Sequence, residues 1–286
     1  VWLYRGQRDR VLALVKNYLG RVCAESGAVP ARLAPFETTL ADLRGRFERL
    51  VGAVAKRAEI EADKRQPLMD ATAELTEAAA LYEADRKKLL ENVAAFGYKY
   101  ANALPAENDA QHTARKTFDP IAEAIRGLVK QVDLLYKLAA RVAELSTEIS
   151  LAPGNGGEGG GEGVPFDRRA TSRLVKQLDE ERKTAVEQLK HAVYFHRQVA
   201  WIQDRFRKAE LQAVPGLVKI VDRKEIEAAD WSLTPGRYVG VAPPEEDEDF
   251  DFEQTLRDIH TELADLNKEA SELAGKIQEN FEELGA

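Results

Sequence analysis

Apolar residues recur at helical spacing along most of this chain, and the pattern is most regular over residues 252–284. There the apolar positions alternate between steps of four and three, which predicts a single coiled-coil helix. The seam positions are Phe252, Leu256, Ile259, Leu263, Leu266, Ala270, Leu273, Ile277, Asn280 and Leu284. Because so narrow a seam needs another helix to cover it, we expect residues 252–286 to form a docking element. The residues expected to dock a partner are Leu256, Ile259, Leu263, Leu266, Leu273 and Ile277.

Five earlier amphipathic stretches predict further long helices. They cover about residues 3–19, 38–64, 67–102, 120–149 and 167–212. We expect a loop through Gly27, Pro30 and Pro35, a break or helix start at Pro67, and a helix start at Pro120. Several such stripes can bury one another, so the predicted fold is mainly α, a coiled-coil bundle of long antiparallel helices.

Composition and turn signals divide the chain into six segments. They are a helical bundle region (1–150), a Gly-rich flexible linker (151–165), a long helix (166–214), a small strand-helix-turn segment (215–244), an acidic spacer (245–251) and the C-terminal coiled-coil helix (252–286). The linker matches the string G-x-G-x-x-G at Gly154, Gly156 and Gly159. We reject a dinucleotide site, because that motif follows a strand and because Glu158 and Glu162 would repel a phosphate.

The residue pattern of the small segment 215–244 differs from that of the long helices and predicts an irregular α/β element. Leu217–Val221 has the composition of a short strand, and Asp222 followed by Glu225 matches a helix-capping box. Pro235-Gly236 suits the centre of a type II turn. Such a turn would position Arg237 and Tyr238 for contact with another domain or with DNA, the alternative being that Tyr238 packs beside Trp231.

The composition favours long helices and argues against several function classes. Aromatic residues are 7% and charged residues 31% of the chain, a mixture typical of helical proteins rather than sandwiches or barrels. The net charge of −8 argues against an autonomous nucleic-acid binder, and we interpret the basic run Arg5, Arg8, Arg10, Lys16 and Arg21 as a solvated helix face. The single Cys and the lack of a long apolar stretch favour a cytoplasmic location without a membrane span.

No arrangement of catalytic or metal-binding residues emerges from the sequence. The four histidines are His112, His191, His196 and His260, and none belongs to a zinc-protease or di-iron motif. We interpret each as a hydrogen-bonded or solvated histidine. The sequence therefore predicts no catalytic, cofactor-binding or metal-binding residue in this chain.

The features between residues 217 and 285 occur in an order that resembles a known family. A Val-Lys-Ile-Val strand, a capped short helix, the run DWSLTPGRYVGV, an acidic spacer and a helix ending IQENFEELG follow one another. This order resembles the C-terminal end of the methyltransferase (M, or modification) subunit of type I restriction-modification systems. The opening WLYRGQ also resembles the segment just after the catalytic domain of that family, so we expect the chain to be part of a longer polypeptide.

The resemblance implies a part in DNA methylation but no chemistry in this chain. The family transfers a methyl group from S-adenosylmethionine to an adenine in DNA, using an Asn-Pro-Pro-Tyr/Phe motif and a glycine-containing cofactor loop. Neither motif occurs here, so the chain should be inactive alone, with S-adenosylmethionine bound by the missing catalytic domain. The implied partners are the specificity subunit, the restriction subunit and, through the complex, DNA.

Two other interpretations stay open. The chain could be a cytoplasmic coiled-coil scaffold that has no connection to DNA. Alternatively, the linker could join helices of a self-contained bundle, with the C-terminal seam folded back onto helix 120–149 and no partner required.

Overall fold

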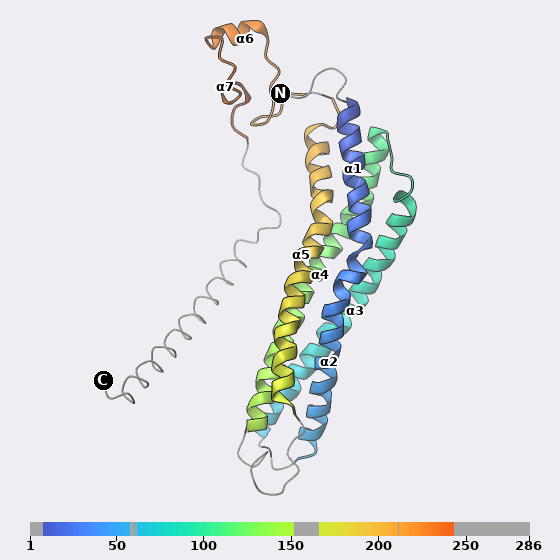
Figure 1. The fold of residues 1–286 in the computed structure, drawn as a ribbon, viewed down its shortest axis with the longest axis vertical. Helices are drawn as coiled ribbons and strands as arrows, with labels where there is room; N and C mark the ends of the chain where they lie inside the picture. The colour runs from blue at the N-terminus through green and yellow to red at the C-terminus, as the bar shows by residue number, and fades with distance from the viewer. Residues whose placement is uncertain (1–7, 58–59, 61, 152–165, 211, 243–286) are drawn as a thin grey trace, which may run out of the picture. The chain divides into compact units, whose positions relative to one another are not determined.

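The computed structural model describes residues 8–57, 60, 62–151, 166–210 and 212–242 (Figure 1). They form five long helices and two short ones: α1 (Arg8–Gly27), α2 (Val29–Ala55), α3 (Ala62–Tyr100), α4 (Asn108–Leu151), α5 (Arg168–Arg205), α6 (Arg223–Ala228) and α7 (Gly236–Val239). The chain divides into two compact units, residues 1–212 and 213–286. The predicted mainly α bundle is confirmed. The predicted coiled-coil helix at 252–286 and the spacer before it lie outside the described residues.

The first unit is a bundle in which α5 contacts three other long helices. α3 packs along α4, α4 packs along α5, and α5 also runs beside both α1 and α2 (Figure 1). α1 and α2 follow one another along α5, separated by the single non-helical residue Ala28. The helix that follows the Gly-rich linker is therefore an integral part of the bundle rather than a separate element.

The stripes seen in the sequence are the faces that the bundle buries. The stripe predicted for 120–149 is enclosed almost throughout in α4. Its buried members are Ile121, Ile125, Leu128, Val132, Leu135, Leu138, Val142 and Ile149. An aromatic cluster joins three helices, because the ring of Phe118 lies 4.9 Å from that of Phe96 and 5.2 Å from that of His196. Each large apolar side chain buried in this way contributes roughly 1.5–3 kcal/mol.

The prediction that prolines delimit the helices is wrong at four positions. Pro30 lies in the first turn of α2 rather than in a loop, and Pro35, Pro67 and Pro120 lie inside α2, α3 and α4. The loop expected through Gly27, Pro30 and Pro35 therefore reduces to a break at Ala28. Pro35 and Pro120 are exposed, so the backbone hydrogen bond that each proline removes is lost on the solvent side while the opposite face stays packed.

Several helix boundaries also differ from the prediction. α1 continues to Gly27 rather than ending near residue 19, because Val22 and Ser26 extend its buried stripe. α3 begins at Ala62, before Pro67, and α5 ends at Arg205 instead of near residue 212. The start of α5 agrees with the prediction, since Asp167 caps the helix by accepting a hydrogen bond from the backbone N–H of Ala170 at 2.9 Å.

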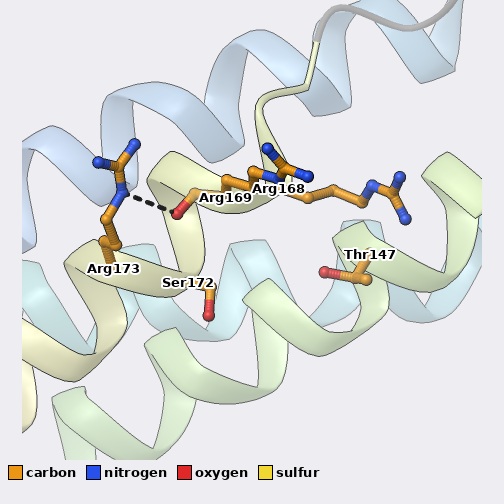
Figure 2. Close-up of a pocket in the computed structure, with 5 residues that line it drawn as sticks. All are labelled: Thr147, Arg168, Arg169, Ser172 and Arg173. Atoms are coloured by element: carbon orange, nitrogen blue, oxygen red, sulfur yellow. Dashed lines mark hydrogen bonds between the residues drawn. The ribbon is translucent and has the colours of Figure 1, made fainter.

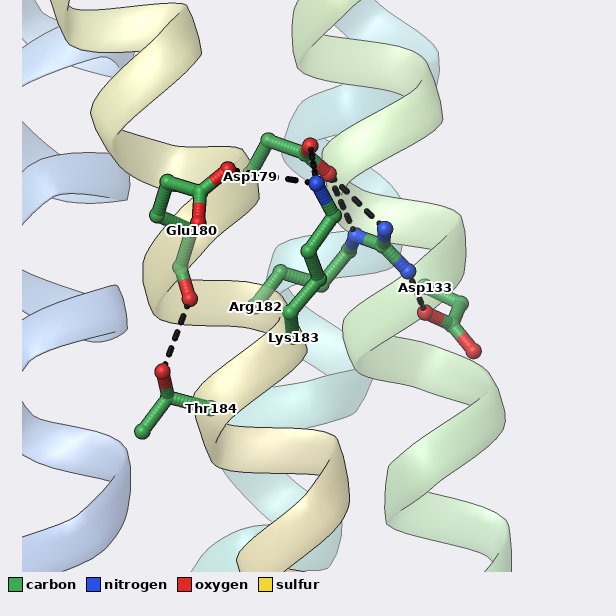
Figure 3. Close-up of polar contacts among 6 residues, drawn as sticks. All are labelled: Asp133, Asp179, Glu180, Arg182, Lys183 and Thr184. Atoms are coloured by element: carbon green, nitrogen blue, oxygen red, sulfur yellow. Dashed lines mark hydrogen bonds and ion pairs between the residues drawn. The ribbon is translucent and has the colours of Figure 1, made fainter.

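An ion-pair network ties α5 to α4 (Figure 3). The Arg182 guanidinium donates to Asp133 on α4 at 2.6 Å and to Asp179 on α5 at 2.8 Å. It also lies 4.9 Å from the ring centre of Tyr136. Burial opposes ionisation of Asp179, but the hydrogen bonds from Lys183 and Arg182 outweigh it and hold the pKa of this carboxyl below its usual value. The network fixes the two helices in register.

The second unit contains no strand among its described residues. Instead of the predicted strand Leu217–Val221, a single antiparallel bridge joins Val214 and Val218 across the Pro215-Gly216 turn. Leu217 and Ile220 are exposed and have no neighbouring strand in this part of the chain, so nothing extends the ladder. The α/β part of the fold prediction is thus reduced to one bridge and two short helices.

Candidate functional site

Residues 213–242 are held in shape by local hydrogen bonds. The capping box predicted at the start of α6 is confirmed: Asp222 accepts from the backbone N–H of Glu225 at 2.8 Å, and Glu225 accepts from the backbone N–H of Asp222 at 3.1 Å. Lys219 adds an ion pair with Glu225 at 2.7 Å. These contacts fix a helix of six residues, which would not be stable from helix propensity alone.

The chain leaves α6 through two consecutive residues in the left-handed region. Asp230 and Trp231 have φ angles of 55° and 56°, which is uncommon for residues other than glycine. The Trp231 backbone N–H donates to the carbonyl of Ile226 at 2.9 Å and so closes the end of the helix. The indole of Trp231 lies 5.6 Å from the guanidinium of Arg223. This turn sets the direction in which the largest side chain of the segment projects.

A second turn closes the segment at Gly216. This glycine has a φ of 75°, and its N–H donates to the carbonyl of Val239 at 2.7 Å. A Cβ atom at this position would lie 2.5 Å from the backbone nitrogen of Ala242. Only glycine therefore allows the two ends of the segment to approach so closely.

Arg237 and Tyr238 are used inside the segment. Arg237 donates to the carbonyl of Ala229 at 3.3 Å, and the Tyr238 hydroxyl donates to the carbonyl of Ser232. The predicted type II turn is wrong: Pro235 has helical angles and precedes α7, and Gly236 does not adopt positive φ. The two side chains thus brace the loop that carries Trp231.

This second unit has order without a core among residues 213–242. None of these residues is buried. Trp231 is 54% exposed and Leu233 is 79% exposed. Large apolar side chains held on a defined backbone, at the surface, are typical of a protein–protein contact site. In the sequence, Trp231 and Leu233 stand out only as members of the run DWSLTPGRYVGV, because their exposure depends on a fold that residue spacing does not reveal.

The titratable groups of the bundle are engaged in structural contacts. The buried ring of His196 places Nε2 at 2.8 Å from a carboxylate oxygen of Asp119, and burial lowers the pKa of this histidine despite that contact. Its Nδ1 atom is buried without a hydrogen-bond partner, so a neutral ring donates to Asp119 through Nε2. Burial raises the pKa of the Cys23 thiol to about 11, which keeps it protonated at neutral pH.

The described residues contain neither a metal-binding cluster nor a membrane-spanning helix. No group of His, Cys, Asp and Glu within the described ranges is arranged to hold a metal ion. In the same part of the chain, no helix combines the length and the apolar character that crossing a membrane requires.

Arginines border two surface hollows at the end of the bundle where α5 begins. The first hollow, about 770 Å³, is lined by Thr147, Arg168, Arg169, Ser172 and Arg173 (Figure 2). The second, about 510 Å³, is lined by Arg46, Arg49, Phe166, Asp167 and Thr171. The sequence analysis missed this cluster, because α2 and α5 are far apart in the chain. The only local signal is the spacing of Arg168, Arg169 and Arg173 at the start of a helix.

The six docking positions predicted in the C-terminal seam, from Leu256 to Ile277, lie outside the described residues. Their expected role is neither supported nor opposed by the geometry above. The two other predicted contact residues, Arg237 and Tyr238, are described and lie within the second unit.

Comparison of the chain with protein-family models, with curated proteins and with solved structures gave no match.

Proposed function

We propose that this chain is an assembly region of a type I restriction-modification methyltransferase subunit. In this proposal it follows the catalytic domain and docks the specificity subunit, so that the complex can methylate its DNA site. S-adenosylmethionine then belongs to the catalytic domain, and the restriction subunit and DNA join through the complex. Residues of the C-terminal seam and of the segment 213–242 make the contacts.

One observation supports the assembly role. In residues 213–242, a backbone with two left-handed residues and a glycine-dependent turn holds large apolar side chains at the surface. Trp231 and Leu233 are more than half exposed, although the backbone around them is fixed by the capping box and the Gly216 closure. Burying two such side chains against a partner is worth several kcal/mol, enough to change an equilibrium by orders of magnitude. The order of motifs around this segment supports the identity of the partner.

The test is co-purification of the methyltransferase subunit that carries this chain with its specificity subunit. Leu233→Asp places a charge in the proposed contact and should weaken assembly at least about tenfold. The matched control is Leu81→Asp, since Leu81 is also an exposed leucine (59%) but lies on α3 of the bundle. Leu266→Asp in the predicted seam should also weaken assembly, whereas the surface change Glu269→Gln should not.

Clear results would contradict the proposal. If Leu233→Asp and Leu266→Asp both assemble as well as the two control variants, neither the second unit nor the seam docks the specificity subunit. Circular dichroism on each variant separates a lost contact from a lost fold.

The alternative function is a cytoplasmic coiled-coil scaffold unrelated to DNA. It is favoured by the bundle itself, whose long helices bury a continuous core and so form a rigid spacer. The coding sequence upstream of Val1 distinguishes the two functions. A methyltransferase domain there supports the assembly role, and an initiator Met there favours the scaffold.

A further inference from the structure

The two arginine-bordered hollows carry a concentration of unbalanced positive charge. Of their five arginines, Arg46 pairs with Asp42 at 3.2 Å. Arg49, Arg168, Arg169 and Arg173 have no carboxylate partner among the described residues. The one carboxylate that lines the hollows belongs to Asp167, which is already engaged in capping α5.

The clustering of these arginines lowers the stability of the isolated bundle. Arg168, Arg169 and Arg173 are exposed and lie in the first turns of α5, where the helix dipole disfavours cations and where the first turn contains no acidic residue. Arg173 makes one long hydrogen bond, from Nε to the carbonyl of Arg169 at 3.3 Å (Figure 2). By contrast, Arg182 on the same helix is half-enclosed and satisfied by two carboxylates. The exposed arginines therefore contribute little to packing, and an external anion would offset their repulsion.

The shape of the site selects among anions. Small-molecule pockets are enclosed and mostly apolar, whereas these hollows are open and lie on either side of the first turns of α5. Guanidinium groups bind phosphate oxygens as bidentate donors, and a row of them matches a ligand with repeated phosphates. Such contacts fix a nucleic-acid backbone without reading its sequence.

We propose that the arginines of α2 and α5 form a binding site for the phosphodiester backbone of duplex nucleic acid. The exposed Ser172 adds a hydroxyl group that can donate to a phosphate oxygen, whereas the hydroxyls of Thr147 and Thr171 already donate to the carbonyls of Ala143 and Asp167 at 2.9 Å. The overall charge of −8, which argues against nucleic-acid binding by the chain as a whole, acts only weakly on this site, because at physiological salt the field of distant carboxylates is screened beyond about 8 Å. The site is independent of the proposed subunit contact, since it lies in the bundle and requires no specificity subunit.

The test is fluorescence anisotropy of a labelled DNA duplex of arbitrary sequence, titrated with the full chain between 50 and 200 mM NaCl. About 0.9 counterions are released per phosphate contact. Five contacts therefore predict that the affinity falls several hundred-fold over this range. The variant R168Q/R169Q/R173Q keeps two of the five arginines, so its affinity should fall only about tenfold over the same range. At 50 mM NaCl it should bind at least about 30-fold more weakly than the unmodified chain.

The matched control is K87Q/K88Q/K130Q, which removes three charges from exposed lysines on α3 and α4. Its affinity should stay within about twofold of the unmodified chain if the site is local rather than a consequence of net charge. Equal weakening of both variants, no weakening of either, or no binding by the unmodified chain at 50 mM NaCl would overturn the proposal.

Competition by inorganic phosphate tests whether the site requires a ligand with several phosphates in a row. Phosphate at an ionic strength matched by NaCl should displace the duplex no better than NaCl does, because single ions lack the repeated contacts. Selective displacement by phosphate would mean that the hollows bind isolated anions, and the backbone proposal would be wrong. Circular dichroism should show unchanged helix content in both triple variants, whose altered residues are exposed.

Discussion

Phe118 in the bundle and Trp231 in the second unit show two ways in which this chain becomes ordered. The Phe118 ring is fully enclosed and touches rings from two other helices. Trp231 is larger but more than half exposed, and the backbone beneath it is fixed by a capping box and two unusual turns. The bundle is thus stabilised by burial, and the segment by local hydrogen bonds. Order maintained without burial leaves apolar surface available for a partner.

The largest effect should come from opening the bundle core. Phe118→Ala removes a fully buried ring and should cost about 3–5 kcal/mol of unfolding free energy. Urea denaturation followed by far-UV circular dichroism measures this loss. Tyr98→Ala is the control, because Tyr98 is 94% exposed and its replacement should change stability by no more than about 0.5 kcal/mol. A loss below about 1 kcal/mol for Phe118→Ala would mean that burial does not dominate the bundle.

A smaller and local effect is expected in the second unit. Gly216→Ala forces a side chain into positive φ and against Ala242, which should destabilise the closure by roughly 1–2 kcal/mol. Hydrogen exchange of the backbone amides at positions 216 and 218 should then accelerate about tenfold, while the free energy of unfolding of the bundle stays unchanged. Gly236→Ala is the matched control, since Gly236 has negative φ and open space around its Cα. Equal acceleration by both variants would show that the segment is not held by the Gly216 turn.

The smallest effect concerns pH and belongs to the bundle alone. Because burial lowers the pKa of His196 in the folded state, the unfolded chain binds a proton more readily, so stability should fall as the pH drops below about 6.5. The slope is at most about 1.4 kcal/mol per pH unit. The lowered pKa values of Glu25 and Asp179 affect stability only below about pH 4.5. A loss of stability between about pH 6.5 and 4.5 is therefore attributed to His196 and not to these carboxyl groups.

His196→Phe checks the origin of this slope. The variant cannot be protonated at this position, so its urea midpoint should be flat between pH 6.5 and 5. A slope equal to that of the unmodified chain would assign the effect to another group.

The sequence predicted the helical stripes well because burial follows the helical period directly. The stripe at 120–149, the start of α5 near residue 167 and the capping box at Asp222 depend on neighbouring residues in the chain, and the structure confirms all three. Helix ends at prolines were predicted wrongly, since Pro35 and Pro120 are tolerated on exposed faces of helices held by packing. Local spacing identifies the apolar face of a helix, but it does not tell which other helix packs on that face.

The candidate sites were harder to predict, for a related reason. Arg49 and Arg168 border hollows at the same end of the bundle although more than a hundred residues separate them, and only the packing of α2 on α5 explains this. Likewise, the sequence placed Arg237 and Tyr238 at a turn of the wrong type. The structure shows their side chains hydrogen-bonded to carbonyls of the same segment, a tertiary arrangement without a periodic signature.

The position of α5 beside α1 and α2 has a consequence for biosynthesis. Both helices leave the ribosome long before their shared partner, and at 5–20 residues per second α5 is complete only about 10–35 s after α1. During that interval the apolar stripes of α1 and α2 have no α5 to cover them. A nascent chain with such stripes is a natural client for chaperones that bind exposed apolar helices, and the yield of folded protein should depend on how quickly translation reaches Arg205.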